Sequence, residues 1–334
     1  MKENPILLEV FKNRFSSISE EMGVTLNRTA FSPNIKERRD SSCAVFDRQG
    51  EMIAQAAHIP VHLGSMPMSV KSAIETVTME DGDMVILNDP FKGGTHLPDI
   101  TVVAPVFAGE EVPSFYVANR AHHADVGGMS SGSMPLSTSL FQEGIIIPPL
   151  KLVEKGEIDR KMMSFLLNNV RTPKEREGDF AAQIMGNITG IRRTQELIEK
   201  YSLKTVDFYA KRLMDYAERL TRHAIEEIPD GNYTFEDFMD DDGINQDTVK
   251  IHVSITIRGD NAILDFSRSS QQVGGSINAV HAITLSAVLY VFRALVKRDI
   301  PTNDGVLRPI TVQTRKGTVV DAQFPAAVAG GNVE

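Results

Sequence analysis

Five short apolar runs between residues 44 and 118 constrain the fold of this chain more than any other feature. Each run is too short for a typical helix and is bounded by Gly, Pro, Asp or Asn, which favour turns. The runs are Ala44–Phe46, Met52–Ala54, Met84–Leu87, Ile100–Val106 and Phe115–Ala118. This pattern predicts the strands of a sheet, and residues 70–77 are expected to form a helix packed on it.

Helical patterns flank these strands. Apolar residues recur at three- and four-residue spacing from Ile6 to Leu26, which predicts an amphipathic helix. Residues 161–167, 174–201 and 205–228 also have helical patterns, and the last two are long and charged on one face. We expect these two to form a helical hairpin set apart from the sheet.

A second mixed region follows the turn Pro229–Gly231, where Pro presets φ and Gly accepts a positive φ. Residues 233–239, 248–257 and 262–266 alternate as strands do, and residues 277–296 form an apolar helical pattern. The sequence therefore predicts a multi-domain α+β fold with mixed sheets and a helical hairpin insertion. The predicted parts are an α+β domain that carries the candidate site, a helical region and a second α+β region, over residues 1–155, 156–229 and 230–334.

Composition excludes several classes of partner. The 334 residues include 35 Lys and Arg against 44 Asp and Glu, and the basic residues are scattered rather than gathered into a nucleic-acid surface. No stretch approaches the roughly 18 apolar residues of a membrane span, and charged residues interrupt the N-terminal stretch where a signal peptide would be apolar. A single cysteine, Cys43, excludes an intrachain disulfide and fits a reducing compartment. We expect a cytoplasmic protein without nucleic-acid or membrane partners.

The densest polar cluster lies in the loop Asn88–Asp99, between two predicted strands. Binding sites are usually assembled at strand ends and in the loops between them. An imidazole and a carboxylate three residues apart, His96 and Asp99, can chelate one divalent ion. The alternative is a capped turn with a hydrogen-bonded Asp and His.

A second cluster, Arg120–Gly128, follows the strand that ends near Ala118 and contributes two histidines and Asp125. Adjacent residues on an extended chain point to opposite faces, so only one of His122 and His123 is expected to share a face with His96. Two such clusters at strand ends favour a metal site. Mixed nitrogen and oxygen ligands suit Zn, Mn or Fe better than Ca or Mg.

Residues 36–40 place three cations before the carboxylate of Asp40. They form either a solvated charge run or a site where Asp40 joins a metal while Arg38 and Arg39 hold an anionic substrate group.

Two other segments carry candidate residues. His58 and His62 are four residues apart, but Pro60 between them predicts a loop rather than a helical metal-binding face. Glu143, at the edge of a Gly- and Pro-rich loop over residues 127–149, is either a general base or an ordinary surface glutamate. No Gly-x4-Gly-Lys-Ser/Thr motif is present, so the sequence shows no standard nucleotide site.

Several of these segments closely resemble the hydantoinase B family, which includes the B components of ATP-dependent hydantoinases and lactamases, the matching half of 5-oxoprolinase, and alpha subunits of acetone carboxylase-type enzymes. The resemblance runs from Pro5 to Glu334, and its motifs are long and specific. The matching segments are Thr29–Asp40, His58–Met66, Asn88–Phe91, Leu97–Asp99, Asn119–Gly128, Phe266–Val273 and Pro325–Glu334.

The resemblance implies a division of labour. A hydantoinase A-type partner with an actin-like ATPase fold uses ATP to phosphorylate the substrate oxygen, and the hydantoinase B-type component binds a divalent metal where the activated intermediate is attacked. The resemblance implies that the metal ligands are Asp40, His96, Asp99 and His122, with His122 preferred to His123. We assign the remaining candidates to catalysis or substrate binding: His123 and Glu143 are expected to be catalytic, and Arg38, Arg39, His58, His62 and Asp125 are expected to bind substrate.

The leading functional prediction is the metal-bearing subunit of an ATP-dependent hydrolase of a small cyclic amide, such as hydantoin, N-methylhydantoin, 5-oxoproline or another lactam. The alternatives are the alpha subunit of an acetone carboxylase-type ligase and a non-catalytic scaffold subunit. Family members continue past the segment that ends at Glu334, so we expect a truncated or split chain that is inactive alone and works in a hetero-oligomer.

Overall fold

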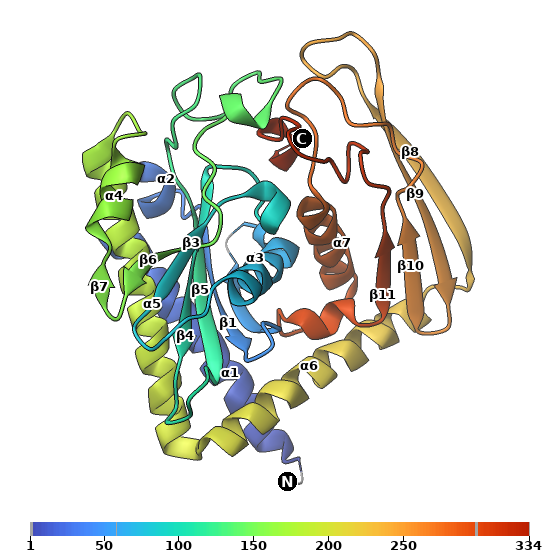
Figure 1. The fold of residues 1–334 in the computed structure, drawn as a ribbon. Helices are drawn as coiled ribbons and strands as arrows, with labels where there is room; N and C mark the ends of the chain where they lie inside the picture. The colour runs from blue at the N-terminus through green and yellow to red at the C-terminus, as the bar shows by residue number, and fades with distance from the viewer. Residues whose placement is uncertain (1–2, 58, 298–299, 334) are drawn as a thin grey trace.

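The computed structural model describes residues 3–57, 59–297 and 300–333. It contains two sheets, with helices on both faces of the larger one (Figure 1). This arrangement confirms the predicted α+β class with mixed sheets. No helix among the described residues combines the length and hydropathy needed to cross a bilayer.

The larger sheet has seven strands in the order β2-β1-β5-β4-β3-β6-β7, and every neighbouring pair is antiparallel. Five of the strands coincide with the five apolar runs, while the short pair β6 and β7 was not predicted. The strands are β1 (Ser41–Asp47), β2 (Met52–Ala57), β3 (Met84–Leu87), β4 (Asp99–Val106), β5 (Phe115–His122), β6 (Leu150–Glu154) and β7 (Glu157–Ile158).

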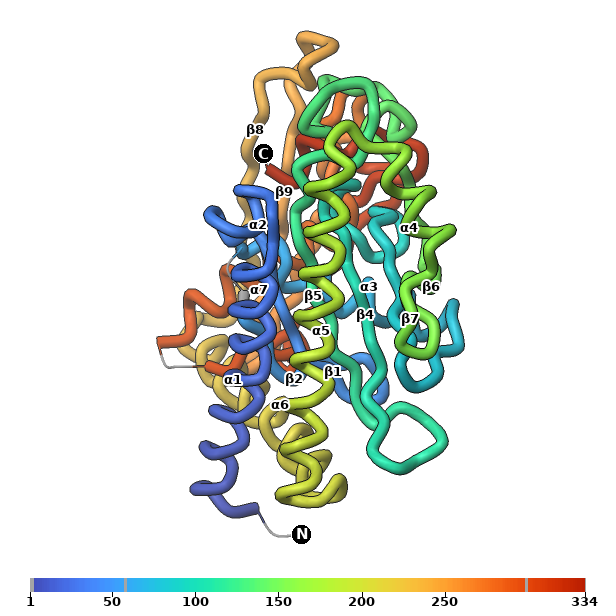
Figure 2. Tube along the Cα trace, turned by 90° about the vertical axis from the view of Figure 1, so that its left-hand side faces the viewer, coloured from blue at the N-terminus to red at the C-terminus, as the bar shows by residue number. Residues whose placement is uncertain are grey.

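Both faces of the central strands are covered. Helices α1 (Pro5–Thr29) and α5 (Pro173–Tyr201) lie side by side on one face, as Figure 2 shows, and α3 (His62–Thr76) packs on the other. Successive apolar residues of these strands point in turn into the cores on the two faces, so each strand is a continuous run of buried residues.

The position of α5 differs from the expected hairpin set apart from the sheet. Helix α5 contacts β4 and β5, and it connects to α6 (Leu203–Glu226), which extends toward the second sheet. The physical reason is a polar seam: Asn119 of β5 donates to the Gln183 carbonyl at 2.7 Å and to Asn187 at 2.8 Å. These buried amides satisfy one another, so a helix that looks polar in sequence packs against the sheet.

The second sheet has four strands in the order β11-β10-β9-β8, in which β10 and β11 are parallel and the other pairs antiparallel. Its strands are β8 (Gly231–Met239), β9 (Val249–Arg258), β10 (Asn261–Asp265) and β11 (Ile310–Gln313). Helix α7 (His281–Leu295) lies between this sheet and α3 (Figure 1). The described residues also form two short α-helices, α2 (Pro33–Lys36) and α4 (Arg160–Leu167), and four short 3-10 helices.

Candidate metal centre

The antiparallel pairing of β4 and β5 brings two candidate ligands together. Asp99 begins β4, His122 ends β5, and the two residues are direct partners in the register. The residue that precedes β1 joins them, because the Asp40 carbonyl accepts a hydrogen bond from the His122 backbone amide at 3.0 Å. His96 lies in the turn before β4. All four candidate ligands therefore lie at one end of the sheet.

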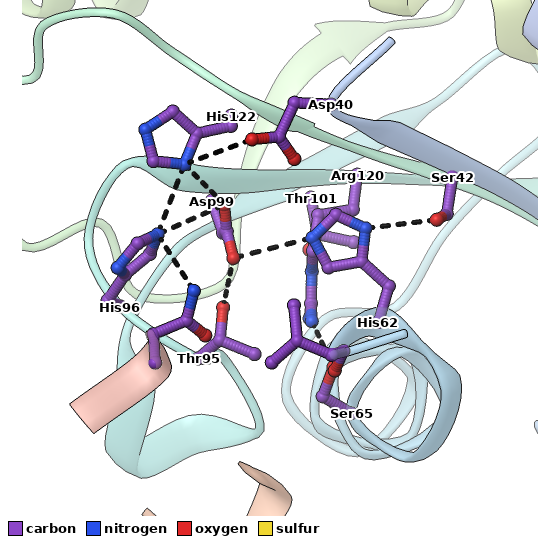
Figure 3. Close-up of polar contacts among 12 residues, drawn as sticks. Asp40, Ser42, His62, Ser65, Thr95, His96, Asp99, Thr101, Arg120 and His122 are labelled. Carbon is purple, nitrogen blue, oxygen red and sulfur yellow. Dashed lines mark hydrogen bonds and ion pairs between the residues drawn. The ribbon is translucent and has the colours of Figure 1, made fainter. Parts of the chain in front are cut away.

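Three ligand atoms converge there: His96 Nε2, Asp99 Oδ1 and His122 Nδ1 (Figure 3). The Asp99 oxygen lies 3.2 Å from His96 Nε2 and 3.1 Å from His122 Nδ1, and the two nitrogens are 3.2 Å apart. Asp40 Oδ2 lies 3.9 Å from His122 Nδ1. In the described part of the chain, this is the one group of three His, Cys, Asp or Glu whose ligand atoms lie within 4.8 Å of one another.

The hydrogen bonds around His96 show which ring nitrogen is free to bind a metal. Its Nδ1 faces the Ala329 carbonyl at 3.3 Å, and a carbonyl only accepts, so Nδ1 carries the hydrogen. The Asn332 amide nitrogen, which only donates, faces Nε2 at 3.5 Å. Nε2 faces the Asp99 carboxylate, where it donates a hydrogen bond when the ring is protonated and can serve as a metal ligand when the ring is neutral. The donor set fits a divalent metal.

Charge within the cluster favours an ionised carboxylate. Burial by itself would raise the pKa of Asp99, but the neighbouring histidines hold it well below its usual range. Burial would lower the pKa of His122, and its hydrogen bond and charge interaction with Asp99 raise it instead. The pKa of Asp40 is raised by burial and by the negative charge of Asp99.

His62 lies on the other side of Asp99. Its Nε2 is 3.4 Å from Asp99 Oδ2, and its Nδ1 pairs with the Ser42 hydroxyl at 2.9 Å (Figure 3). Residues 59–61 form the loop expected around Pro60, and α3 begins directly after it at His62. A proline just before the start of a helix does not prevent the helix from forming. The His62 imidazole therefore lies at the first helical position. His58 lies outside the described residues.

Two polar residues of the site were missed in the sequence. Thr95 donates from its hydroxyl to Asp99 Oδ2 at 2.5 Å. Arg120 is fully buried in β5 and donates to the hydroxyls of Thr101 at 2.9 Å and Ser69 at 2.7 Å, and also to that of Ser65. Burial lowers its pKa to about 10, and Asp99 opposes that shift. An arginine within a buried strand was the available signal.

Two predicted residues face away from the cluster. His123 points to the α5 side of β5, where its Nε2 pairs with Gln183 at 2.9 Å and its ring lies 4.7 Å from that of Phe180. Burial and the charge of Arg176 lower the pKa of His123 to about 4. Asp125 forms an ion pair with Arg171 at 2.7 Å. The structure brings neither one to the candidate ligands His96, Asp99 and His122.

The other predicted residues divide into exposed and buried groups. Arg38 and Arg39 are exposed just before Asp40, and Arg39 has a left-handed backbone with φ of 56°. Glu143 is fully buried, so it is not a surface glutamate. Its Oε1 accepts from the Ser137 hydroxyl and from the backbone amides of Val328 and Ala329. Burial raises its pKa.

Comparison with known proteins gives related sequences along the whole chain. Residues 4–334 match the family described as hydantoinase B/oxoprolinase. A 5-oxoprolinase from Dictyostelium discoideum is 41% identical over 342 residues, which cover 99% of this chain and 26% of that protein. A Pseudomonas protein named as the B component of a D-/L-hydantoinase is 32% identical, covering 97% of this chain and 58% of that protein.

Solved structures show the same fold. The ATP-dependent caprolactamase from Pseudomonas jessenii superimposes with a TM-score of 0.92 at 30% identity, over 99% of this chain and 58% of that one. An acetone carboxylase superimposes with a TM-score of 0.90 at 20% identity, over 98% and 46% respectively, and shares the fold alone. The chain spans less than two thirds of the length of each of these proteins. It belongs to the hydantoinase B/oxoprolinase family.

Proposed function

We propose that this chain is the metal-bearing component of an ATP-dependent hydrolase of small cyclic amides. The observation that carries the proposal is the convergence of His96 Nε2, Asp99 Oδ1 and His122 Nδ1, with the other ring nitrogen of His96 facing the Ala329 carbonyl. Support for the reaction class comes from relatives named as a 5-oxoprolinase, a D-/L-hydantoinase component and an ATP-dependent caprolactamase.

His96, Asp99 and His122 would hold the ion, with Asp40 as the fourth ligand. A bound divalent ion of the Zn, Mn or Fe type would supply a water molecule of lowered pKa and would polarise the substrate oxygen. Two neighbouring side chains orient the Asp99 carboxylate. Thr95 and His62 fix the second oxygen of Asp99, so its first oxygen stays directed at the two ligand nitrogens.

The direction of substrate approach follows from exposure. The side chains of His96 and Asp99 are each 1% exposed, whereas that of Asp40 is 29% exposed. Substrate therefore approaches from the Asp40 side, where Arg38 and Arg39 are also exposed. A phosphorylated amide carries negative charge, and guanidinium groups match phosphate oxygens. We assign these two arginines to the anionic group of the activated substrate.

The chemistry requires a partner. A ring amide is a poor electrophile, and phosphorylation of its oxygen creates a leaving group. This chain has no Gly-x4-Gly-Lys-Ser/Thr motif, so we assign the ATP step to a hydantoinase A-type ATPase partner in a hetero-oligomer.

The test is turnover by the chain co-expressed with its ATPase partner, assayed with hydantoin, 5-oxoproline and caprolactam in the presence of ATP and a divalent metal. We expect ring opening and ADP release that His96→Ala abolishes. The matched control is His252→Ala, which removes another buried histidine, in β9 of the second sheet. ATP hydrolysis by this chain alone, unaffected by His96→Ala, would contradict the division of labour. Product formation only from acetone and bicarbonate would favour a carboxylase.

A further inference from the structure

A buried carboxylate ties together two segments far apart in the sequence. Glu143 Oε1 accepts from the Ser137 hydroxyl at 2.7 Å, the Val328 amide at 2.8 Å and the Ala329 amide at 3.0 Å. The same loop is held to Pro325, whose carbonyl accepts from the Leu140 amide at 3.0 Å. Three donors to one carboxylate oxygen are charge-assisted bonds, which are shorter and stronger than neutral ones.

The segment held by Glu143 touches the metal centre at one point. The Ala329 carbonyl accepts the hydrogen on His96 Nδ1, so it sets the tautomer and the rotation of the His96 ring. Glu143 holds the amide of the same residue. A continuous path of hydrogen bonds therefore runs from Glu143 through Ala329 to His96.

Glu143 does not contact the ligand atoms themselves. Its Oε1 is occupied by the three donors, and its Oε2 is buried without a hydrogen-bond partner. The side chain is fully buried, so substrate does not reach it. These contacts do not suit the general base expected from the sequence, and they leave a role that acts through Ala329.

We propose that Glu143 is a positioning residue that orients His96 for metal binding by fixing the Ala329 carbonyl. This inference rests on the proposed metal function. Without Glu143, the Val328 and Ala329 amides lose their acceptor, and a buried unpaired amide is costly, so this stretch shifts to find another. The carbonyl then leaves His96 Nδ1, and Nε2 is no longer held toward Asp99.

The rest of this segment has independent anchors. Asn278 donates to the Ala327 carbonyl at 3.0 Å, and the Ser276 carbonyl accepts from the amides of Gly330 and Gly331. Removal of Glu143 is therefore expected to disturb residues 328 and 329 while the segment stays docked.

The experiment measures the affinity of the purified chain for Co²⁺ and Zn²⁺ by chelator competition, with the visible spectrum of bound Co²⁺ as a second readout of ligand geometry. We expect Glu143→Ala to weaken binding by about 10- to 100-fold, the usual effect of losing a partner that orients a metal-binding histidine. Glu143→Gln keeps an acceptor oxygen and should bind within about threefold of wild type. If Glu143→Ala does not fold, Glu143→Asp withdraws the carboxylate by one methylene and is expected to weaken binding by at least about tenfold.

A matched control is available in Asp47, at the opposite end of the seven-stranded sheet. This buried carboxylate also accepts backbone amides, those of Gln49 and Glu51, both at 2.9 Å. Asp47→Ala is expected to lower stability and leave metal affinity unchanged. Equal losses of affinity in Asp47→Ala and Glu143→Ala would overturn the proposal, and so would wild-type affinity in folded Glu143→Ala.

The experiment distinguishes failure of the proposed metal function from failure of the positioning role of Glu143. If wild type binds no divalent metal, the metal function fails, and the positioning role is then tested by ¹⁵N shifts of the His96 ring, assigned with His96→Gln. The proposal expects a hydrogen on Nδ1 in wild type and loss of that preference in Glu143→Ala. An unchanged tautomer in Glu143→Ala would overturn it.

Discussion

The two ends of the seven-stranded sheet both bury carboxylates, but they affect the charge in opposite ways. At the end where β4 begins, burial would raise the pKa of Asp99, yet three surrounding histidines hold it well below its usual range. At the opposite end, where β1 turns into β2, burial raises the pKa of Asp47 and raises that of Asp304 to about 6. Glu51 and Asp47 add negative charge beside Asp304.

Burial of acidic side chains does not by itself create a candidate metal site. The acids at the β1–β2 turn are bonded to backbone amides: Asp47 accepts from Gln49 and Glu51, and Asp304 accepts from Met52. Asp99 Oδ1 instead faces two imidazole nitrogens, His96 Nε2 and His122 Nδ1, which converge on it. Imidazole nitrogens that converge with a carboxylate oxygen form a possible metal-ligand set, and among the described residues such a set occurs at one end only of this sheet.

Removal of the negative charge of Asp99, at the candidate metal centre, is expected to change metal binding most. Asp99→Asn should reduce bound metal to near zero, because it removes the central oxygen ligand and leaves the histidines without their counter-charge. Asp304→Asn makes the same chemical change at the opposite end and should leave metal content unchanged. Elemental analysis after metal loading and desalting measures both. Full metal in Asp99→Asn would show that the two ends do not differ as proposed.

A finer test separates the two faces of β5. His122→Gln should weaken metal binding by more than about 100-fold, since loss of a ligand exceeds the usual effect of losing a ligand's partner. His123→Gln should stay within about threefold of wild type, because that side chain faces Gln183 on the α5 side. Chelator competition gives both affinities. The reverse ranking would assign the metal to His123.

The smallest expected effect is on stability, at the acidic end. Folded Asp304 keeps its proton up to about pH 6, whereas the unfolded chain loses it near the ordinary value of 3.8. Raising the pH from about 4 to about 6 therefore destabilises the fold, and Asp304→Asn removes this loss while keeping an acceptor for the Met52 amide. The variant should be more stable than wild type at pH 7 by about 1 to 3 kcal/mol and equal to it near pH 4. Urea unfolding midpoints at the two pH values decide, and a variant advantage that is larger at pH 4 would reverse the sign.

Much of the fold follows from local pattern. Strand β3 coincides with its predicted run, and α5 begins one residue before its predicted start, because apolar spacing and turn residues are properties of neighbouring positions. The contact of α5 with the sheet did not follow. It depends on Asn119, Gln183 and Asn187, and the pairing of amides so far apart leaves no periodic signal.

The candidate site, too, could be predicted only in part from the sequence. Alternation along β5 predicted that one of two adjacent histidines would face His96, and the structure directs His122 to the cluster and His123 to α5. The role of Ala329 could not be predicted, since it acts through its backbone carbonyl, which every residue type possesses. Arg120 and Thr95 act through contacts set by tertiary packing.

The hydrogen bond between His96 and Ala329 also bears on the order of events in folding, because it joins residues 233 positions apart. Loop closure costs more entropy as the loop lengthens, so such distant contacts form after hairpins and helices. The strands that present Asp99 and His122 can pair while residues 325–333 are still undocked. Given the metal function proposed above, tight metal uptake is expected to mark the last stage of folding, and the rate at which a refolding chain takes up Co²⁺ would report when this final segment docks.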